Sequence, residues 1–174
     1  MNSLRAFNLK QWIDDHREYL KPPVGNRCVF RDSQFIVMVV GGPNSRTDYH
    51  VDPSEEFFYQ LEGDITLKTI QNGQPVDIAI REGDIFLLPA NIPHSPRRPA
   101  NTIGLVIERT RGANEVEGFM WYCETCHHKL YEEFLQISDI ETQLPPIFKR
   151  FYSSAEHRTC KQCGTLMAIP DNPQ

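Results

Sequence analysis

Residues 56–96 read EFFYQLEGDITLKTIQNGQPVDIAIREGDIFLLPANIPHSP, and this stretch decides the fold class. It consists of short runs of β-branched and aromatic residues, separated every few positions by the turn-forming sequences EGD, QNGQP, a second EGD and NIPHSP. Short strands at such close, regular spacing are typical of antiparallel barrels and jelly rolls. A parallel sheet would need helices between its strands, and none fit here. The sequence therefore predicts an all-β-dominated fold, either a barrel or a jelly roll.

The segments on either side extend this pattern. Residues 34–40 (QFIVMVV) and 102–109 (TIGLVIER) are two more short apolar runs. Residues 7–20 (FNLKQWIDDHREYL) space apolar side chains among charges as an amphipathic helix does, and KPPVGN then ends the helix. Residues 111–118 are polar, contain glycine and are interpreted as a linker. In a chain of 174 residues, this pattern predicts a barrel with a short N-terminal helix over residues 1–112 and a small tail over residues 113–174.

Charge and hydropathy exclude several classes of partner. The formal net charge is −5, and most of it lies in residues 113–174, whereas nucleic acids and anionic membranes require a basic surface. No apolar run reaches the length that a membrane-spanning helix needs, and the first residues lack the apolar stretch of a signal peptide. We therefore expect a cytoplasmic protein that binds neither nucleic acid nor membrane.

Four of the five cysteines form two CxxC pairs in the tail: Cys123 with Cys126, and Cys160 with Cys163. Disulfides are disfavoured in a reducing cytoplasm, so paired cysteines at this spacing are better interpreted as metal ligands. Four thiolates close a tetrahedral site, which suits zinc or iron and leaves no position open for a reaction. The tail is therefore predicted to hold a structural metal, either Fe or Zn.

A second group of candidate ligands lies in the barrel. His50 is followed by acids at positions 52, 55 and 56, and His94 ends the strand-and-turn segment quoted above. Either histidine taken singly would more often be an ordinary surface or hydrogen-bonded residue. Two imidazoles and one carboxylate on one side of an ion, however, leave positions open for a substrate and dioxygen, as in Fe(II) oxygenases.

These segments resemble the two motifs of the cupins, small metal-binding jelly-roll barrels. In the first motif Gly42, His50, Glu56 and Gly63 match the cupin pattern, and the six residues before Gly63 select Glu56 over Glu55. Asp48 stands where cupins usually have their first histidine. In the second motif Gly83, Pro89 and His94 match. The resemblance implies a cupin barrel whose metal ligands are His50, Glu56 and His94.

A closer resemblance covers nearly the whole chain. The segments GGPNSRTDYH, EEFFYQLEGD, EGDIFLLPANIPHSPRRPANT and GLVIER are similar in order and spacing to the 3-hydroxyanthranilate 3,4-dioxygenase family, and the CxxC pairs match its bacterial and fungal forms with a rubredoxin-like tail. The resemblance implies a non-haem Fe(II) enzyme of the kynurenine pathway. It implies that 3-hydroxyanthranilate and O2 become 2-amino-3-carboxymuconate semialdehyde, which cyclises to quinolinate, a precursor of NAD.

The resemblance also implies roles for three charged residues. Arg98 and Glu108 match substrate-binding positions, with Glu56 beside them, and Arg46 matches the arginine next to dioxygen. The chemistry is consistent, because the planar fork of an arginine pairs well with the carboxylate of an aromatic acid. In an extended segment Arg46 also shares a face with His50, and Arg98 shares a face with His94, since side chains repeat every second residue. Arg46, Arg98 and Glu108 are thus the predicted catalytic residues.

Two other functions remain open from the sequence. One is a different cupin oxygenase that acts on another small acid. The other is a non-catalytic cupin sensor whose tail works as a zinc ribbon on nucleic acid, although the acidic tail disfavours that hypothesis. The exposed sheet edges expected in such a fold would also allow a homodimer.

Overall fold

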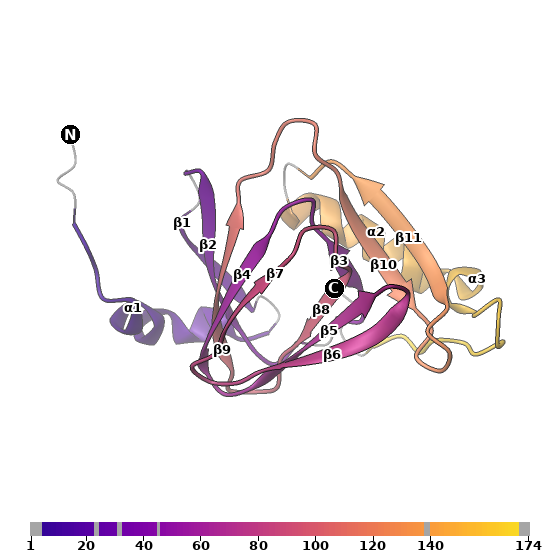
Figure 1. Cartoon of the computed structure of the whole chain (residues 1–174), viewed down its shortest axis with the longest axis horizontal. Helices are drawn as coiled ribbons and strands as arrows, with labels where there is room; N and C mark the ends of the chain where they lie inside the picture. Colours follow the sequence, from indigo (N-terminus) through magenta and orange to yellow (C-terminus); the bar gives the residue numbers. More distant parts are fainter. Residues whose placement is uncertain (1–4, 23–24, 31–32, 45, 138–139, 171–174) are drawn as a thin grey trace.

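The computed structural model describes residues 5–22, 25–30, 33–44, 46–137 and 140–170, with only the backbone described at 140–142 (Figure 1). The predicted N-terminal helix is present as α1 (Leu9–His16) and a 3-10 turn, η1 (Arg17–Leu20). The strands are β1 (Asn26–Phe30), β2 (Phe35–Gly41), β3 (Tyr49–Val51), β4 (Glu56–Glu62), β5 (Ile65–Gln71), β6 (Gln74–Ile80), β7 (Ile85–Leu88), β8 (His94–Arg97), β9 (Ile103–Arg109), β10 (Glu117–Tyr122) and β11 (Lys129–Leu135). The tail adds α2 (Ile140–Ser153) and α3 (Ala155–Arg158).

The strands form two facing antiparallel sheets. One has five strands in the order β1-β2-β9-β4-β7, and the other has six in the order β11-β10-β3-β8-β5-β6. Between β3 and β10 the chain passes repeatedly from one sheet to the other, which is the course of a jelly roll. The prediction of a sheet-dominated barrel with a short N-terminal helix is confirmed.

Turn chemistry explains why the quoted stretch folds in this way. Asn72 and Gly73 both have positive φ, 50° and 75°, so they can form the tight turn between β5 and β6. The two EGD turns also hydrogen-bond to each other. The backbone N–H of Gly63 donates to the Glu82 carboxylate over 2.8 Å, and the N–H of Glu82 donates to Asp64 over 2.9 Å. The repeated sequence therefore builds a matched pair of turns at the same edge of the barrel.

Several strands escaped the sequence analysis. β3 and β8 are too short to display an alternating pattern, and β8 contains a proline. The proposed linker over residues 111–118 is wrong at its end, because Glu117 and Gly118 already belong to β10. β10 pairs with β3 of the barrel, so strands from residues 1–112 and from residues 113–174 share one sheet. The division at residue 112 stays a prediction.

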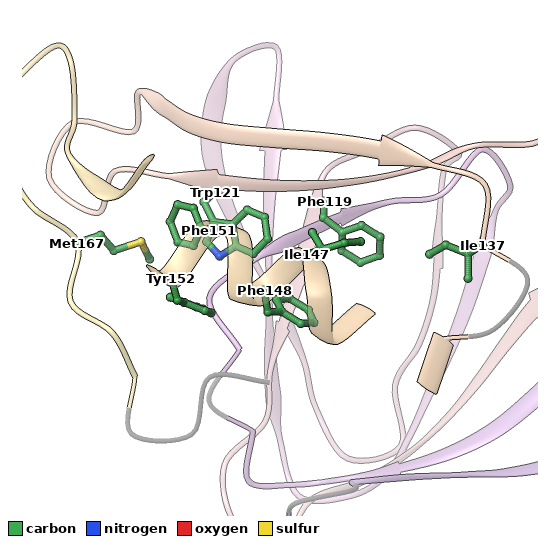
Figure 2. Packing of buried hydrophobic residues seen from close by; sticks show 8 residues of the cluster. All are labelled: Phe119, Trp121, Ile137, Ile147, Phe148, Phe151, Tyr152 and Met167. Carbon is green, nitrogen blue, oxygen red and sulfur yellow. The ribbon is translucent and has the colours of Figure 1, made fainter. Parts of the chain in front are cut away.

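Four groups of buried apolar side chains in the described residues hold these layers together, one of which lies on the six-stranded sheet around Tyr49 and Met120. Phe58, Leu67 and Val106 belong to the cluster inside the barrel, whereas Ile13 of α1 packs with Val39 on the outer face of the five-stranded sheet. The tail has its own cluster, in which α2 packs on β10 (Figure 2). Its members are Phe119, Trp121, Ile137, Ile147, Phe148, Phe151, Tyr152 and Met167. Within the described residues, no helix is long and apolar enough to cross a membrane.

Candidate metal centre and active site

Three predicted metal ligands meet inside the barrel. His50 lies on β3 and His94 on β8, and these two residues are direct partners in the antiparallel pairing. Glu56 is the first residue of β4 in the facing sheet. One ligand atom from each of His50, Glu56 and His94 lies within 4.8 Å of the others. Because the two sheets bring these residues together, a spacing of 44 positions along the chain becomes a compact group.

The local hydrogen bonds orient His94 and Glu56 as metal ligands. The Nδ1 of His94 lies 3.0 Å from the carbonyl oxygen of Ile92 and can donate a hydrogen bond to it, so Nε2 is the nitrogen left to bind a cation. That Nε2 lies 2.8 Å from Oε2 of the buried Glu56, with which it forms an ion pair when the ring is protonated. Burial alone would raise the pKa of the Glu56 carboxyl, but the adjacent His94 outweighs it and lowers this pKa. A bound cation could replace the proton shared by this imidazole nitrogen and this carboxylate oxygen, since both are ordinary metal ligands.

His50 is held by residues that the sequence analysis missed. Its Nε2 lies 2.7 Å from Oε2 of Glu117, and its ring stacks on Phe119 at 5.2 Å between centroids. Arg111 binds Glu117 with its Nε and reaches Glu108 over 3.3 Å with Nη2. Glu117 is only 2% exposed, and a carboxylate buried to this extent is stable only when charged or hydrogen-bonding partners such as these surround it. The acid-rich stretch 115–117 was visible in the sequence, but only the pairing of β10 with β3 brings Glu117 to His50.

Glu108 lies beside the metal-ligand group. It is the register partner of Glu56 across β4 and β9, and it is 6% exposed. Burial, reinforced by the negative charge of Glu56, raises the pKa of the Glu108 carboxyl to about 8. At neutral pH this carboxyl therefore keeps its proton unless a ligand or a cation changes the local charge.

Arg98 is a buried cation that forms no ion pair within the described residues, although its charge acts on the buried Glu56. It is 3% exposed, its Nη1 donates to Gln60 over 3.3 Å, and its Nε has no partner. Among the described residues no carboxylate forms an ion pair with it, and burial lowers its pKa to about 10. A glycine makes room for this side chain, because a Cβ at Gly104 would lie 2.8 Å from Nη1. Such a site favours an anionic ligand.

Arg46 has an anion of its own. Its Nε and Nη2 donate to the two carboxylate oxygens of Asp48 over 2.9 and 2.5 Å. Asp48, at the position of the usual first cupin histidine, is almost fully buried. The departure from the cupin motif thus replaces a metal ligand by an acid that fixes the direction of Arg46.

The four tail cysteines also come together. The sulfurs of Cys123 and Cys163 lie 3.6 Å apart, those of Cys126 and Cys160 lie 3.5 Å apart, and all four fall within 4.8 Å of one another. Each CxxC pair forms a tight turn, closed by the N–H of His127 bonding to Cys123 and by that of Gly164 bonding to Cys160. This geometry fits one tetrahedral metal ion.

The jelly roll and the His50–Glu56–His94 group inside it together define a cupin fold with a candidate metal-binding group in the barrel. A family model, described as 3-hydroxyanthranilic acid dioxygenase, matches residues 1–152. The chain belongs to this family.

Relatives in the family cover almost the same length. The chain is 56% identical over 164 residues to the 3-hydroxyanthranilate 3,4-dioxygenase of Xanthomonas euvesicatoria, covering 94% of this chain and 93% of that protein. It is 49% identical over 166 residues to the protein of the same name from Bacillus thuringiensis, covering 95% and 93%. A solved cupin-2 domain protein from Shewanella frigidimarina has a TM-score of 0.49 and 13% identity, covering 60% of this chain and 94% of that one.

Proposed function

We propose that the protein is a 3-hydroxyanthranilate 3,4-dioxygenase, which uses O2 to open the ring of 3-hydroxyanthranilate and yields 2-amino-3-carboxymuconate semialdehyde. The observation that carries the choice of substrate is Arg98, a buried and unpaired cation whose charge acts on the ligand Glu56. A small aromatic acid would supply the missing anion. Spontaneous closure of the product to quinolinate would place the enzyme in the kynurenine route to NAD.

His50, Glu56 and His94 would hold Fe(II), since two imidazoles and one carboxylate leave coordination positions open. When bound, such an ion supplies electrons to O2 and a positive charge that attracts the deprotonated ring hydroxyl. Arg98 would then bind the substrate carboxylate through a bidentate pair and so orient the ring. The positive charge of the bound ion would lower the pKa of the Glu108 carboxyl, so that the ionised carboxylate could take the proton of the ring hydroxyl, and Arg46 would stabilise negative charge that develops on dioxygen.

One assay tests this function against the other cupin reactions. The purified protein is loaded anaerobically with Fe(II), mixed with 3-hydroxyanthranilate and air, and followed by the absorption of the ring-opened product and by an oxygen electrode. We expect one O2 consumed for each ring opened, and we expect benzoate and 2-aminophenol to be poor substrates. If iron fills the barrel and 3-hydroxyanthranilate remains intact, the proposed function is wrong and a different cupin reaction is favoured.

The raised pKa of Glu108 predicts how the stability of the metal-free protein depends on pH. Because the folded pKa of about 8 lies above the unfolded one, the folded state binds the extra proton between the two values. The contribution of Glu108 to stability is therefore present at low pH and is lost as the pH rises toward about 8. We expect Glu108→Gln to remove this part of the pH dependence. The free energies of unfolding of the wild type and the variant, measured by urea unfolding, should therefore diverge between about pH 5 and pH 8. Parallel curves over that range would contradict the assignment.

We propose that Cys123, Cys126, Cys160 and Cys163 hold a structural Fe or Zn ion, and that the reduced thiols reflect a cytoplasmic location. Cys160→Ala is expected to lose one metal per chain while the barrel metal remains, as measured by elemental analysis. Losing the ion should lower the melting temperature by about 10 °C, because a structural metal contributes several kcal/mol to folding. Cys28→Ala, outside the site, is the control, and equal effects of the two changes would contradict the proposal.

We also propose that two copies of the chain associate through the outer face of the five-stranded sheet. α1 covers one end of this face, but Tyr59 and Ile85, which pair across β4 and β7, stay exposed together with Leu87 on β7, and Phe35 is exposed on β2 two strands away from β4. A contiguous apolar face of this kind is typical of self-association. Leu87→Asp is expected to convert a dimer to a monomer in sedimentation velocity, whereas Val116→Asp, an equally exposed site elsewhere, should leave the dimer intact. If the wild-type protein sediments as a monomer, the proposed dimer is refuted.

A further inference from the structure

The tail helix α2 reaches the barrel next to the candidate active site. Phe148 on this helix is 4% exposed, and its ring centroid lies 5.4 Å from the guanidinium carbon of Arg46. The same ring meets Phe119 edge to face at 6.3 Å, and Phe119 stacks on the predicted iron ligand His50. In Figure 2, Phe148 is carried by α2 and Phe119 lies between this helix and the strands. Phe148 thus connects α2 to two residues of the site.

A second contact lies one helical turn further along α2. The hydroxyls of Tyr152 and Thr47 are 2.7 Å apart, and Thr47 is the residue that follows Arg46. Phe148 and Tyr152 are four positions apart, so they project from the same face of the helix. The helix is in turn anchored on β10, where Phe151 stacks on Trp121 at 4.3 Å. The segment that carries Arg46 therefore packs against α2, which is itself fixed on β10.

Arg46 needs this support to hold one position. Its side chain is 37% exposed, and a long arginine stem loses much conformational freedom when it is fixed. Asp48 accepts two hydrogen bonds along one edge of the Arg46 guanidinium, but these bonds do not prevent the guanidinium plane from rotating about that edge. An aromatic ring placed over the cation removes this freedom and attracts the positive charge. The acid and the ring together define both the direction and the plane of the guanidinium.

We propose that Phe148 is a positioning residue for Arg46, so that the tail helix α2 forms part of the active site. The inference rests on the proposed function, in which Arg46 acts on dioxygen. It assigns α2 a role in the reaction that is separate from the metal-binding role of the cysteines. Losing the aromatic ring should therefore affect the reaction with O2 and leave binding of the aromatic acid by Arg98 unchanged.

Two variants of the Fe(II)-loaded protein test this inference. Phe148→Leu keeps the apolar bulk without the ring, and Phe148→Tyr keeps the ring. We expect Phe148→Leu to lower kcat/KM for O2 by about 3- to 10-fold, the range of a partly exposed cation–π contact, while Phe148→Tyr retains most of it. The Kd for 3-hydroxyanthranilate, measured anaerobically, and the iron content should stay at the wild-type values in both.

Further readouts separate positioning from a general loss of structure. Trp121 fluorescence reports whether α2 is docked, and it should be unchanged in both variants. The side-chain Nε–H resonance of Arg46, assigned from its absence in Arg46→Lys, should lose its ring-current shift in Phe148→Leu only, and this readout needs no turnover. Equal kinetics in both variants, or parallel losses of Trp121 signal, iron and substrate binding, would overturn the inference. An inactive wild type with a normal Arg46 shift would instead refute the proposed function alone.

Discussion

Replacing His94 by alanine is expected to reduce ring opening to the uncatalysed background and to remove iron from the barrel. His94 is 2% exposed, and its Nε2 lies 2.8 Å from Oε2 of Glu56. Without the His94 imidazole, only His50 and Glu56 remain as protein ligands, and Glu56 loses its contact with His94. The affinity for iron should fall by more than the roughly 10- to 100-fold that is usual when a residue hydrogen-bonded to a metal ligand is replaced.

The measurement combines iron analysis after gel filtration with turnover of 3-hydroxyanthranilate under saturating Fe(II). Circular dichroism establishes that the variant is folded, and His50→Ala, at a less buried position, serves as a second variant if His94→Ala is not. His128→Ala is the matched control, because that histidine is exposed and lies outside the barrel site. Normal turnover by the folded His94 variant would refute the ligand assignment.

Replacing Arg98 by methionine is expected to weaken binding of 3-hydroxyanthranilate by about 100- to 1,000-fold, because truncating one partner of a buried charge pair costs several kcal/mol. Methionine keeps the unbranched stem, so the cavity between Gly104 and Gln60 is only partly emptied. Arg98→Lys should recover little, since a single ammonium group cannot form the two parallel hydrogen bonds of a guanidinium.

The experiment is sharpest when the ligand is varied as well. Anaerobic titration gives the Kd of 3-hydroxyanthranilate and of 2-aminophenol, which lacks the carboxylate. The large difference between wild type and Arg98→Met should appear with the first ligand and vanish with the second. Arg81→Met, an exposed arginine, controls for the loss of one positive charge. Equal losses for both ligands would show that Arg98 does not bind the carboxylate.

Much of this site was predictable because local patterns specify it. The fixed spacings of the two motifs predict the ligands, and the structure places Glu56 and His94 at the first residues of β4 and β8 and His50 in the middle of β3. Glu56 was preferred over Glu55 on spacing alone, and the structure buries Glu56 beside His94 while Glu55 stays exposed. Arg98 and Arg97 could not be ranked from composition, and the structure buries Arg98, one residue past the end of β8, while Arg97 stays partly exposed.

Other features have no local signal. β3 spans only Tyr49–Val51, too few residues for a visible period, yet it carries His50 and pairs with both β8 and β10. Glu117 lies 67 positions from His50, so its contact with the ring depends on strand register that no single segment encodes. The two hydrogen bonds between Arg46 and Asp48 were also not predicted, because the sequence showed Asp48 only as a departure from the cupin motif.

The sequence by itself determined the jelly roll, the two ligand groups and the family, because turns, alternation and CxxC spacing are properties of neighbouring residues. Only the tertiary structure decided which long-range partners complete the site. The carboxylate of Glu117 reaches His50, and Phe148 of the tail helix packs over Arg46, 102 positions away. The physical reason is that such contacts are selected by strand register and by the docking of α2 on β10, which depend on the packing of the whole molecule.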